Sequence, residues 1–318
     1  MTALPTGYRV GHAEDGVGLT GCTVILPPAG TIAAVDVRGG SPGTRETGVF
    51  APGNLISEIH ALVFAGGSAF GLAAASGVTA WLRERGAGVP VGPARVPIVA
   101  AAVLFDLAVG DPNAFPDEAM GRRACDAATA SASESTGSAS RRGRVGAGAG
   151  ATAGKLLGAA HASDGGIGIA AQRLPDGAVV AALVAVNAFG DVVDPDTGAP
   201  LAGPRVASGA AGDPYVSERA LREDARIDSP LGGVGANTTL VCVATTVPFD
   251  TGSLKRVAIE AHGGISRAIR PAHTVVDGDV AFALAPPGPV PALLARLRVG
   301  AAAAHVVARA IVDAVAPR

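Results

Sequence analysis

The stretch Leu231–Leu240, LGGVGANTTL, brings glycines, an asparagine and two adjacent threonines to the start of an apolar run that continues to Ala244. Glycine permits positive φ and close backbone approach, and asparagine tolerates the same region. A strained or exposed peptide bond just before a threonine hydroxyl is what an intramolecular N→O acyl shift requires. The alternative is a plain turn that enters a core strand. These residues alone favour the turn, so the rest of the chain has to decide.

The composition is that of a globular protein with a large core. The chain has 318 residues, 48% of them apolar, and no polar linker divides it, so we expect one domain over residues 1–318. A net charge of −2 gives no reason to expect nucleic acid or an anionic membrane surface as a partner. The three cysteines are far apart and form no CxxC, which predicts reduced packing cysteines and a cytoplasmic location.

One uncharged stretch, residues 61–82, is long enough to span a membrane. Gly66-Gly67-Ser68 interrupts it, and its apolar residues are mostly alanine and glycine. We therefore expect a strand, a turn and a helix there. The first 20 residues lack the apolar core of a signal peptide.

Apolar runs and turn residues predict the elements of the fold. Strands are expected at 22–26, 31–37, 61–64, 96–107, 166–173, 178–186, 240–246 and 279–284. Helices are expected at 68–85, 117–130, 215–226, 253–269 and 291–315. We expect the first two strands to form a hairpin around Pro27-Pro28-Ala29-Gly30, and Ser68 to cap its helix. Because strands and helices do not alternate regularly, the order predicts an α+β fold with two sheets covered by helices.

Residues 146–155, GAGAGATAGK, match the relaxed dinucleotide fingerprint G-x-G-x-x-A and imitate a P-loop. The P-loop pattern fails at two defining positions, which Ala149 and Leu156 occupy. A cofactor- or nucleotide-binding protein that uses Gly146–Lys155 is the alternative function. Lys155 is one of only two lysines in the chain. It is either a surface ammonium or a charge held in a pocket.

A few other polar residues have both a structural and a functional interpretation. Asn187 ends an apolar run and is either a turn residue or an amide donor to an oxyanion. Asp277 and Asp279 are either a solvated turn or two carboxylates at a strand end. His262 and His273 lack a third ligand at metal spacing, so we expect no metal there.

Six blocks of sequence, in one order along nearly the whole chain, resemble the DmpA-type N-terminal-nucleophile hydrolases. This family includes β-peptidyl aminopeptidases, the L-aminopeptidase/D-esterase DmpA and the nylon-oligomer hydrolase NylC. The blocks are GVGLTGCTVILPPAGTIAAVDVRGGSPGTRET (16–47), LVFAGGSAFGL (62–72), GAGAGATAGK (146–155), VAVN (184–187), GANTT (235–239) and RPAHTVVDGDVAFAL (270–284). The resemblance implies an α-β-β-α sandwich that needs no cofactor. It also implies self-cleavage into residues 1–237 and 238–318, and a homo-oligomer, a tetramer of cleaved heterodimers.

Carried over position by position, the resemblance places the cleavage site between Asn237 and Thr238 and makes Thr238 the N-terminal nucleophile. Its other implied active-site residues are Lys155, Asn187 and the pair Asp277 and Asp279, which orient the nucleophile or bind a substrate amine. The implied substrate pocket contains Gly66, Gly67, Ser68 and Phe70. Phe70 stands where several members have tyrosine, so this chain lacks a hydroxyl at that position.

The implied substrates are short peptides, amino-acid amides or esters, and ω-amino acid oligomers. The free α-amine of Thr238 would serve as general base for its own hydroxyl, and a nearby ammonium of Lys155 would lower the pKa of that amine. A folded member of the family that never cleaves, and is inactive, is a further alternative.

Overall fold

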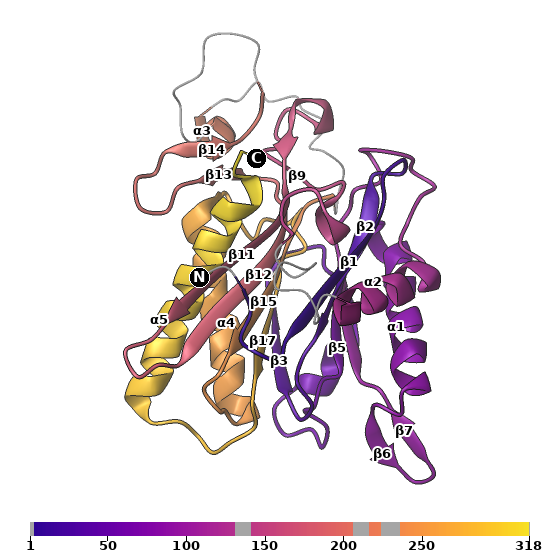
Figure 1. Ribbon diagram of the computed structural model, residues 1–318. Coiled ribbons are helices and arrows are strands. Elements are labelled where there is room, and N and C mark those ends of the chain that lie inside the picture. The colour runs from indigo at the N-terminus through magenta and orange to yellow at the C-terminus, as the bar shows by residue number, and fades with distance from the viewer. Residues whose placement is uncertain (1–2, 131–140, 206–215, 224–235, 318) are drawn as a thin grey trace.

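Two five-stranded sheets face each other, and helices cover their outer faces (Figure 1). The computed structural model describes residues 3–130, 141–205, 216–223 and 236–317. The first sheet has the order β1 (Arg9–Asp15), β2 (Thr20–Leu26), β5 (Ala61–Ala65), β8 (Val99–Val103) and β4 (Gly43–Arg45). The second has the order β11 (Gly166–Arg173), β12 (Val179–Asn187), β15 (Thr238–Thr245), β17 (Val280–Ala285) and β3 (Ile32–Val37).

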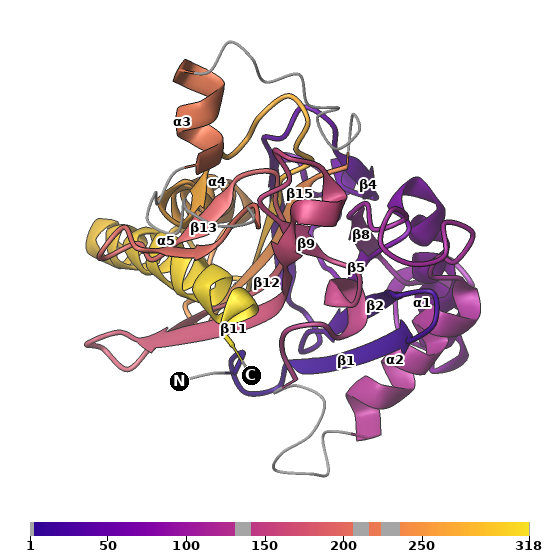
Figure 2. The same cartoon turned by 90° about the horizontal axis from the view of Figure 1, so that it is seen from above.

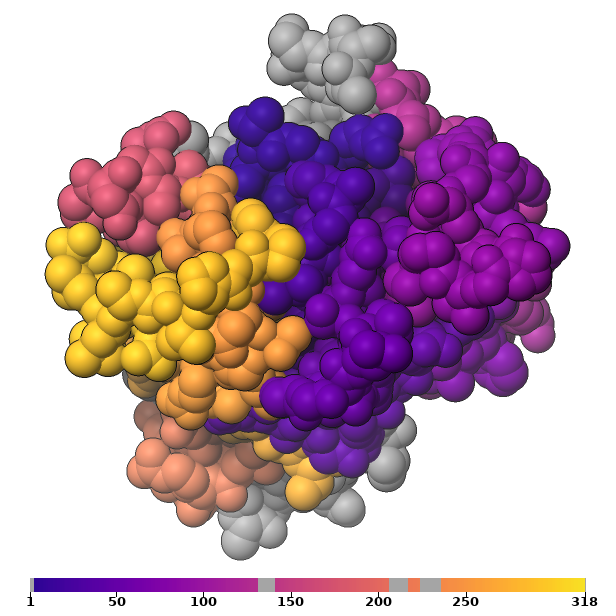
Figure 3. Space-filling view, turned by 90° about the horizontal axis from the view of Figure 1, so that it is seen from below, coloured from indigo at the N-terminus to yellow at the C-terminus, as the bar shows by residue number. Residues whose placement is uncertain are grey.

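The helices form the outer layers of the sandwich. Helices α1 (Ala73–Glu84) and α2 (Glu118–Ala130) lie outside the first sheet, and α4 (Thr251–Ala268) and α5 (Leu293–Val315) lie outside the second. Seen from above, the two pairs of helices are on opposite sides of the sheets (Figure 2). From below, the C-terminal orange and yellow residues and the purple N-terminal residues occupy opposite sides of the molecule (Figure 3). The expected α-β-β-α architecture is therefore confirmed.

The central strands are buried on both faces, which explains why they appear in the sequence as nearly continuous apolar runs. In β15, Leu240 and Cys242 join the core between the two sheets. The alternating residues Val241 and Val243 join the core under α4 and α5. A third core lies between the first sheet and α1 and α2. Full burial of a Val or Leu side chain stabilises the fold by about 1.5–3 kcal/mol. The buried residues of β15 therefore hold this strand firmly in place.

Short elements complete the described structure. They are α3 (Val216–Glu223), β6 (Val89–Val91), β7 (Ala94–Val96), β9 (Thr152–Ala153), β10 (Ser163–Asp164), β13 (Asp191–Val193), β14 (Pro200–Ala202) and β16 (Ile269–Arg270). The 3₁₀ turns of the described residues lie at Gly48–Phe50, Ser68–Leu72, Gly146–Gly148 and Ala159–His161. Residues 231–235 of the opening stretch, and residues 215 and 224–226 of the helix expected at 215–226, lie outside the described residues.

The expected hairpin of residues 22–26 and 31–37 is wrong. Both edges of β2 are already occupied, by β1 and β5, and β3 pairs with β17 in the other sheet. Pro27 and Pro28, which have no N–H to donate, carry the chain from one sheet to the other. The strand β1 was not predicted at all.

The expected helix from Ser68 begins later than predicted. Gly67 and Ser68 have positive φ values of 74° and 53°, and the α-helix starts at Ala73 after a 3₁₀ turn. The N–H groups of Gly67 and Ser68 donate to Asp106 Oδ1 and Leu104 O, which ties this loop to the end of β8. The strand expected at 96–107 is only Val99–Val103, because Pro97 precedes it and the chain turns beyond it toward Asp106.

Among the described residues, none of the helices combines the length and the apolar character needed to cross a membrane. The uncharged stretch 61–82 is divided between β5, a 3₁₀ turn and α1.

Candidate active site

Strand register brings the predicted site residues to one end of the second sheet. Strands β12 and β15 are antiparallel, and Asn187 is directly opposite Thr238. Strand β17 runs parallel to β15 on its other side, and an isolated bridge pairs Asn237 with Asp277 just before both strands begin. Asn187, Thr238 and the 277–279 segment therefore lie side by side at the same end of three neighbouring strands.

The hydroxyl of Thr238 lies against the peptide bond that precedes it. Thr238 is 3% exposed, and its Oγ1 donates to the carbonyl oxygen of Asn237 at 2.5 Å. The backbone N–H of Gly278 donates to that same oxygen at 2.7 Å. A Cβ on Gly278 would lie 2.8 Å from Thr238 Oγ1 and 2.7 Å from the carbonyl oxygen of Ser41. Only glycine therefore fits beside the hydroxyl, and its N–H is aimed at the carbonyl.

Lys155 is buried beside this peptide and makes three hydrogen bonds. Its Nζ donates to Asn187 Oδ1 at 2.7 Å, to Asn187 O at 2.9 Å and to Ala236 O at 3.0 Å. Three acceptors match the three protons of an ammonium group. Burial lowers the pKa of Lys155 to about 7, while the carboxylates of Asp277 and Asp106 favour its charged form. Lys155 therefore holds its proton less tightly than an exposed lysine does.

The amide of Asn187 is also fully engaged. Its Nδ2 donates to Phe105 O at 2.9 Å and to Ala236 O at 3.2 Å, and its Oδ1 also accepts from the N–H of Thr152. Neither amide proton is bonded to the Asn237 oxygen. In this state, the Asn237 carbonyl accepts from the Thr238 hydroxyl and the Gly278 N–H, and not from the Asn187 amide.

The carboxylate of Asp277 is turned toward Thr274. Its Oδ2 accepts from the Thr274 N–H at 2.9 Å and from the Thr274 hydroxyl at 2.6 Å, and its Oδ1 lies 3.4 Å from the N–H of Phe189. Burial and the neighbouring Asp279 raise the pKa of Asp277. The backbone of the same residue holds the loop of Ser41, whose N–H donates to Asp277 O.

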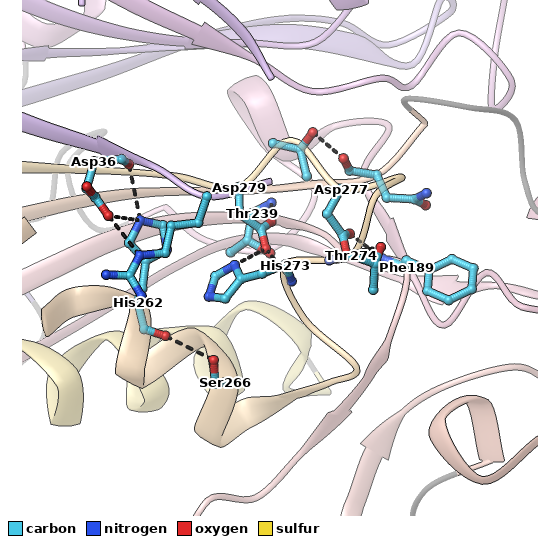
Figure 4. Close-up of polar contacts among 12 residues, drawn as sticks. Asp36, Phe189, Thr239, His262, Ser266, His273, Thr274, Asp277 and Asp279 are labelled. Atoms are coloured by element: carbon cyan, nitrogen blue, oxygen red, sulfur yellow. Dashed lines mark hydrogen bonds and ion pairs between the residues drawn. The ribbon is translucent and has the colours of Figure 1, made fainter. Parts of the chain in front are cut away.

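Asp279 links β15 to a pair of histidines (Figure 4). Its Oδ1 accepts from the N–H of Thr239 at 2.7 Å, and its Oδ2 accepts from the N–H of His273 and lies 2.7 Å from His273 Nδ1. The rings of His273 and His262 meet edge to face, with centroids 4.8 Å apart. Nε2 of His262 lies 3.1 Å from Asp36 O, and burial lowers the pKa of His262 to about 4. Burial thus disfavours the charged form of His262, as is usual for a core histidine.

Only part of the predicted substrate pocket, which contains Gly66, Gly67, Ser68 and Phe70, lies beside these site residues. Gly66 and Gly67 are buried beside Asp106, which follows Phe105, the carbonyl partner of Asn187. Phe70, in contrast, is 62% exposed and packs its ring 5.5 Å from that of Phe115. Phe70 is therefore not buried with the other predicted site residues.

Several residues of the site were missed from the sequence: Asp106, His273, Thr274 and Gly278. Asp106 has a recognisable signal, because it follows an apolar strand just as Asn187 does. Burial raises its pKa, although it accepts the Gly67 N–H. Gly278 acts through its backbone, which leaves no side-chain signal in a sequence.

The glycines of residues 146–155 serve close packing. A Cβ on Gly146 would lie 2.4 Å from Thr23 Oγ1, and one on Gly150 would lie 2.1 Å from Leu19 O. These glycines let the segment pass against the first sheet and deliver Lys155 to the site. The Lys155 ammonium is already bonded to protein acceptors, so the geometry does not favour the nucleotide alternative.

Comparison with known proteins agrees with this geometry. The model of peptidase family S58 matches residues 6–317. The chain belongs to peptidase family S58. It is 43% identical over 331 residues to an uncharacterized aminopeptidase of Mycobacterium tuberculosis, covering 97% of this chain and 91% of that protein. It is 32% identical over 279 residues to the 6-aminohexanoate-oligomer endohydrolase of Kocuria sp., covering 87% of this chain and 72% of that enzyme. This S58 member is therefore a hydrolase.

Solved structures of the same fold support the architecture. The Burkholderia sp. beta-aminopeptidase superposes with a TM-score of 0.68 at 23% identity, covering 98% of this chain and 84% of that one. The L-aminopeptidase D-Ala-esterase/amidase of Ochrobactrum anthropi, a variant of the Ntn-hydrolase fold, gives a TM-score of 0.69 at 20% identity, covering 98% and 85%. The S58 chain thus has an α+β fold of the Ntn-hydrolase type.

Proposed function

We propose that this S58 hydrolase cleaves its own chain between Asn237 and Thr238 and then uses Thr238 as an N-terminal nucleophile against amide bonds of small substrates. One observation carries the proposal. The Thr238 hydroxyl and the Gly278 N–H both contact the carbonyl oxygen of Asn237, at 2.5 Å and 2.7 Å. A nucleophile and an oxyanion donor are thereby assembled on a single peptide bond.

Self-cleavage would proceed through an ester. Thr238 Oγ1 adds to the carbonyl carbon of Asn237, its proton passes to the Thr238 nitrogen, and the Gly278 N–H stabilises the oxyanion. The C–N bond then breaks, and the nitrogen leaves as the α-amine of Thr238. Water hydrolyses the resulting ester, which leaves a carboxylate on Asn237 and restores the hydroxyl. Loss of one oxyanion donor typically costs about 2.7–4 kcal/mol, so the Gly278 contact is a large share of the catalysis.

In the cleaved enzyme, the α-amine of Thr238 would act as general base for its own hydroxyl. An ordinary α-amine titrates at about 8, and an ammonium on Lys155 nearby lowers that pKa. More of the amine is then free base at neutral pH. A substrate amide is attacked in the same way, its amine product leaves, and water releases the acyl group.

The remaining residues hold this arrangement. Asp279 fixes the backbone through the N–H of Thr239, and Asp277 fixes the 274–278 turn that carries the Gly278 N–H. Asn187 becomes an oxyanion donor once Ala236 no longer occupies its amide. The fragments 1–237 and 238–318 would stay together as one folded unit in the cytoplasm. Tetramers of such heterodimers are part of the same proposal.

The substrates proposed are short peptides, amino-acid amides or esters, and ω-amino acid oligomers. The printed names of the relatives, an aminopeptidase and a 6-aminohexanoate-oligomer endohydrolase, support this range.

Two adjacent threonines give a matched test of the proposal. Wild-type protein should show two chains by intact mass, the second beginning at Thr238. Thr238→Ala should remain one full-length chain, because the nucleophile is gone, and Thr238→Ser should still cleave. Thr239→Val, which keeps the N–H that Asp279 binds and the shape of the side chain, should cleave like wild type. Two fragments from Thr238→Ala, or one chain from wild type, would refute the proposal.

A further inference from the structure

A cavity lies at the edge of the first sheet, between the edge strand β4 and helix α1. Both elements are in the half of the molecule that the first sheet builds (Figure 2). The cavity has a volume of about 480 Å³, which is within the range of small-molecule sites. It is lined by two arginines, two hydroxyl residues, an alanine and a glutamate: Arg45, Ser76, Thr79, Ala80, Arg83 and Glu84. None of these residues belongs to the cluster around Thr238.

The two arginines of this cavity have no counter-charge. In the described part of the chain, neither Arg45 nor Arg83 has a carboxylate at ion-pair distance. Glu84, the carboxylate of the lining, is already bound by both Nη atoms of Arg122, at 3.0 and 2.8 Å. Guanidinium groups stay charged at neutral pH, so two positive charges face one cavity.

Hydrogen-bond donors are also left over at the cavity. Arg45 Nη1 donates to Ser76 Oγ at 2.8 Å, and a guanidinium has four further N–H groups to offer. Ser76 Oγ accepts this bond, so the Ser76 proton can point to another acceptor. The Thr79 hydroxyl is directed into its own helix, because it donates to Ala75 O at 2.8 Å. Positive charge together with paired N–H donors is the chemistry that binds carboxylates and phosphates.

Like charges at one cavity repel each other, and an anion between them replaces this repulsion by two attractions. We propose that the cavity binds a small dianion, a dicarboxylate or a phosphate compound, between the guanidinium groups of Arg45 and Arg83. The Ser76 hydroxyl is the third donor to this anion. Arg45, which lies in the sequence block 16–47 and takes no part in the proposed reaction, thereby gains a function.

Calorimetric titration at low ionic strength tests the site with two probes, inorganic phosphate and succinate. We expect wild-type protein to bind at least one of them saturably, one anion per chain, with a Kd of about 1 mM or lower. Tighter binding of phosphate identifies phosphate compounds as the ligand class, and tighter binding of succinate identifies dicarboxylates. Thr238→Ala should bind equally well, so the result does not depend on self-cleavage.

Arg83→Gln is the decisive variant, because the Arg83 side chain is exposed and glutamine keeps the helix propensity. It should raise the Kd by about tenfold or more, the effect of losing one hydrogen bond to a charged group, and Arg45→Gln should do the same. The matched control is Arg296→Gln on α5, which removes an equally exposed arginine far from the cavity lining. The absence of saturable binding, an unchanged Kd in Arg83→Gln, or an equal rise in Arg296→Gln would overturn the proposal.

Discussion

The backbone N–H of Gly278 donates a 2.7 Å hydrogen bond to the carbonyl oxygen of Asn237. A side chain at position 278 would not fit, because its Cβ would lie 2.8 Å from the Thr238 hydroxyl oxygen. A methyl group at position 278 would collide with Ser41 O and Thr238 Oγ1 and push the N–H away from the carbonyl oxygen, so Gly278→Ala should slow self-cleavage by about 100-fold, the typical effect of losing one oxyanion donor. The measurement is the rate at which the full-length chain disappears during cell-free synthesis.

A glycine with open surroundings provides the control for that substitution. A Cβ on Gly48 would meet nothing within 4 Å, so Gly48→Ala should cleave at the wild-type rate. Equal rates for the two alanine variants would contradict the role given to the Gly278 N–H.

Replacing Lys155 should abolish self-cleavage. Its ammonium has three acceptors in a buried site, two on Asn187 and one on Ala236, so Lys155→Met removes one hydrogen bond from each of these oxygens and frees the Asn187 amide to turn. Lys155→Arg should fail as well, because a planar guanidinium does not fit a pocket shaped for a compact ammonium. Intact mass after overnight incubation gives the result, and circular dichroism checks that both variants are folded. A folded Lys155→Met variant that cleaves normally would remove Lys155 from the mechanism.

The pKa of Lys155 also predicts how stability depends on pH. In the folded protein it is lowered to about 7 from the ordinary 10.5, so between these values the unfolded chain binds one proton more. The free energy of unfolding should then rise with pH, by up to about 1.4 kcal/mol per pH unit. Urea unfolding of Thr238→Ala, which keeps the chain whole, measures this rise.

The matched double variant, Thr238→Ala with Lys155→Met, isolates the contribution of the lysine. All other titrating groups are shared by this double variant and Thr238→Ala. As pH rises above 7, the free energy of unfolding should therefore increase more in Thr238→Ala, which keeps the lysine, than in the double variant. A difference that is independent of pH would contradict the lowered pKa.

His273 should affect self-cleavage through Asp279. It has a positive φ of 57°, which glycine and asparagine both tolerate. His273→Asn keeps an N–H donor near the position of Nδ1, whereas His273→Gly removes it. We expect the glycine variant to cleave about tenfold more slowly and the asparagine variant to stay close to wild type. Rates that are equally reduced in both would mean that the hydrogen bond to Asp279 is not what matters.

The sequence predicts the core elements well because both faces of the central strands are buried. Strands at 166–173, 178–186, 240–246 and 279–284, and the helices at 253–269 and 291–315, agree with the structure to within a few residues. Strand pairing was harder to predict. Whether residues 22–26 and 31–37 pair depends on which sheet edges distant strands have already filled, and no local pattern encodes that.

The clustering of the five side chains predicted as catalytic is present in the structure. Asn187, Thr238, Asp277 and Asp279 lie together because β12 ends, and β15 and β17 begin, at the same end of the second sheet. Lys155 reaches them from the chain that follows β9. The Gly278 N–H and the bonds of Ala236 belong to the backbone, so composition and motifs could not reveal them. The actual partners of Asn187 were likewise hidden, since an amide can turn toward any nearby carbonyl.

In the second sheet, β15 and β17 stand between β12 and β3, with hydrogen bonds on both sides. A break before Thr238 would divide this sheet between two polypeptides, neither of which holds all of its strands. The order of events is then fixed, because the chain must fold before it can be cut. The nucleophile would be created inside a finished structure, and neither polypeptide could diffuse away as an active protease by itself.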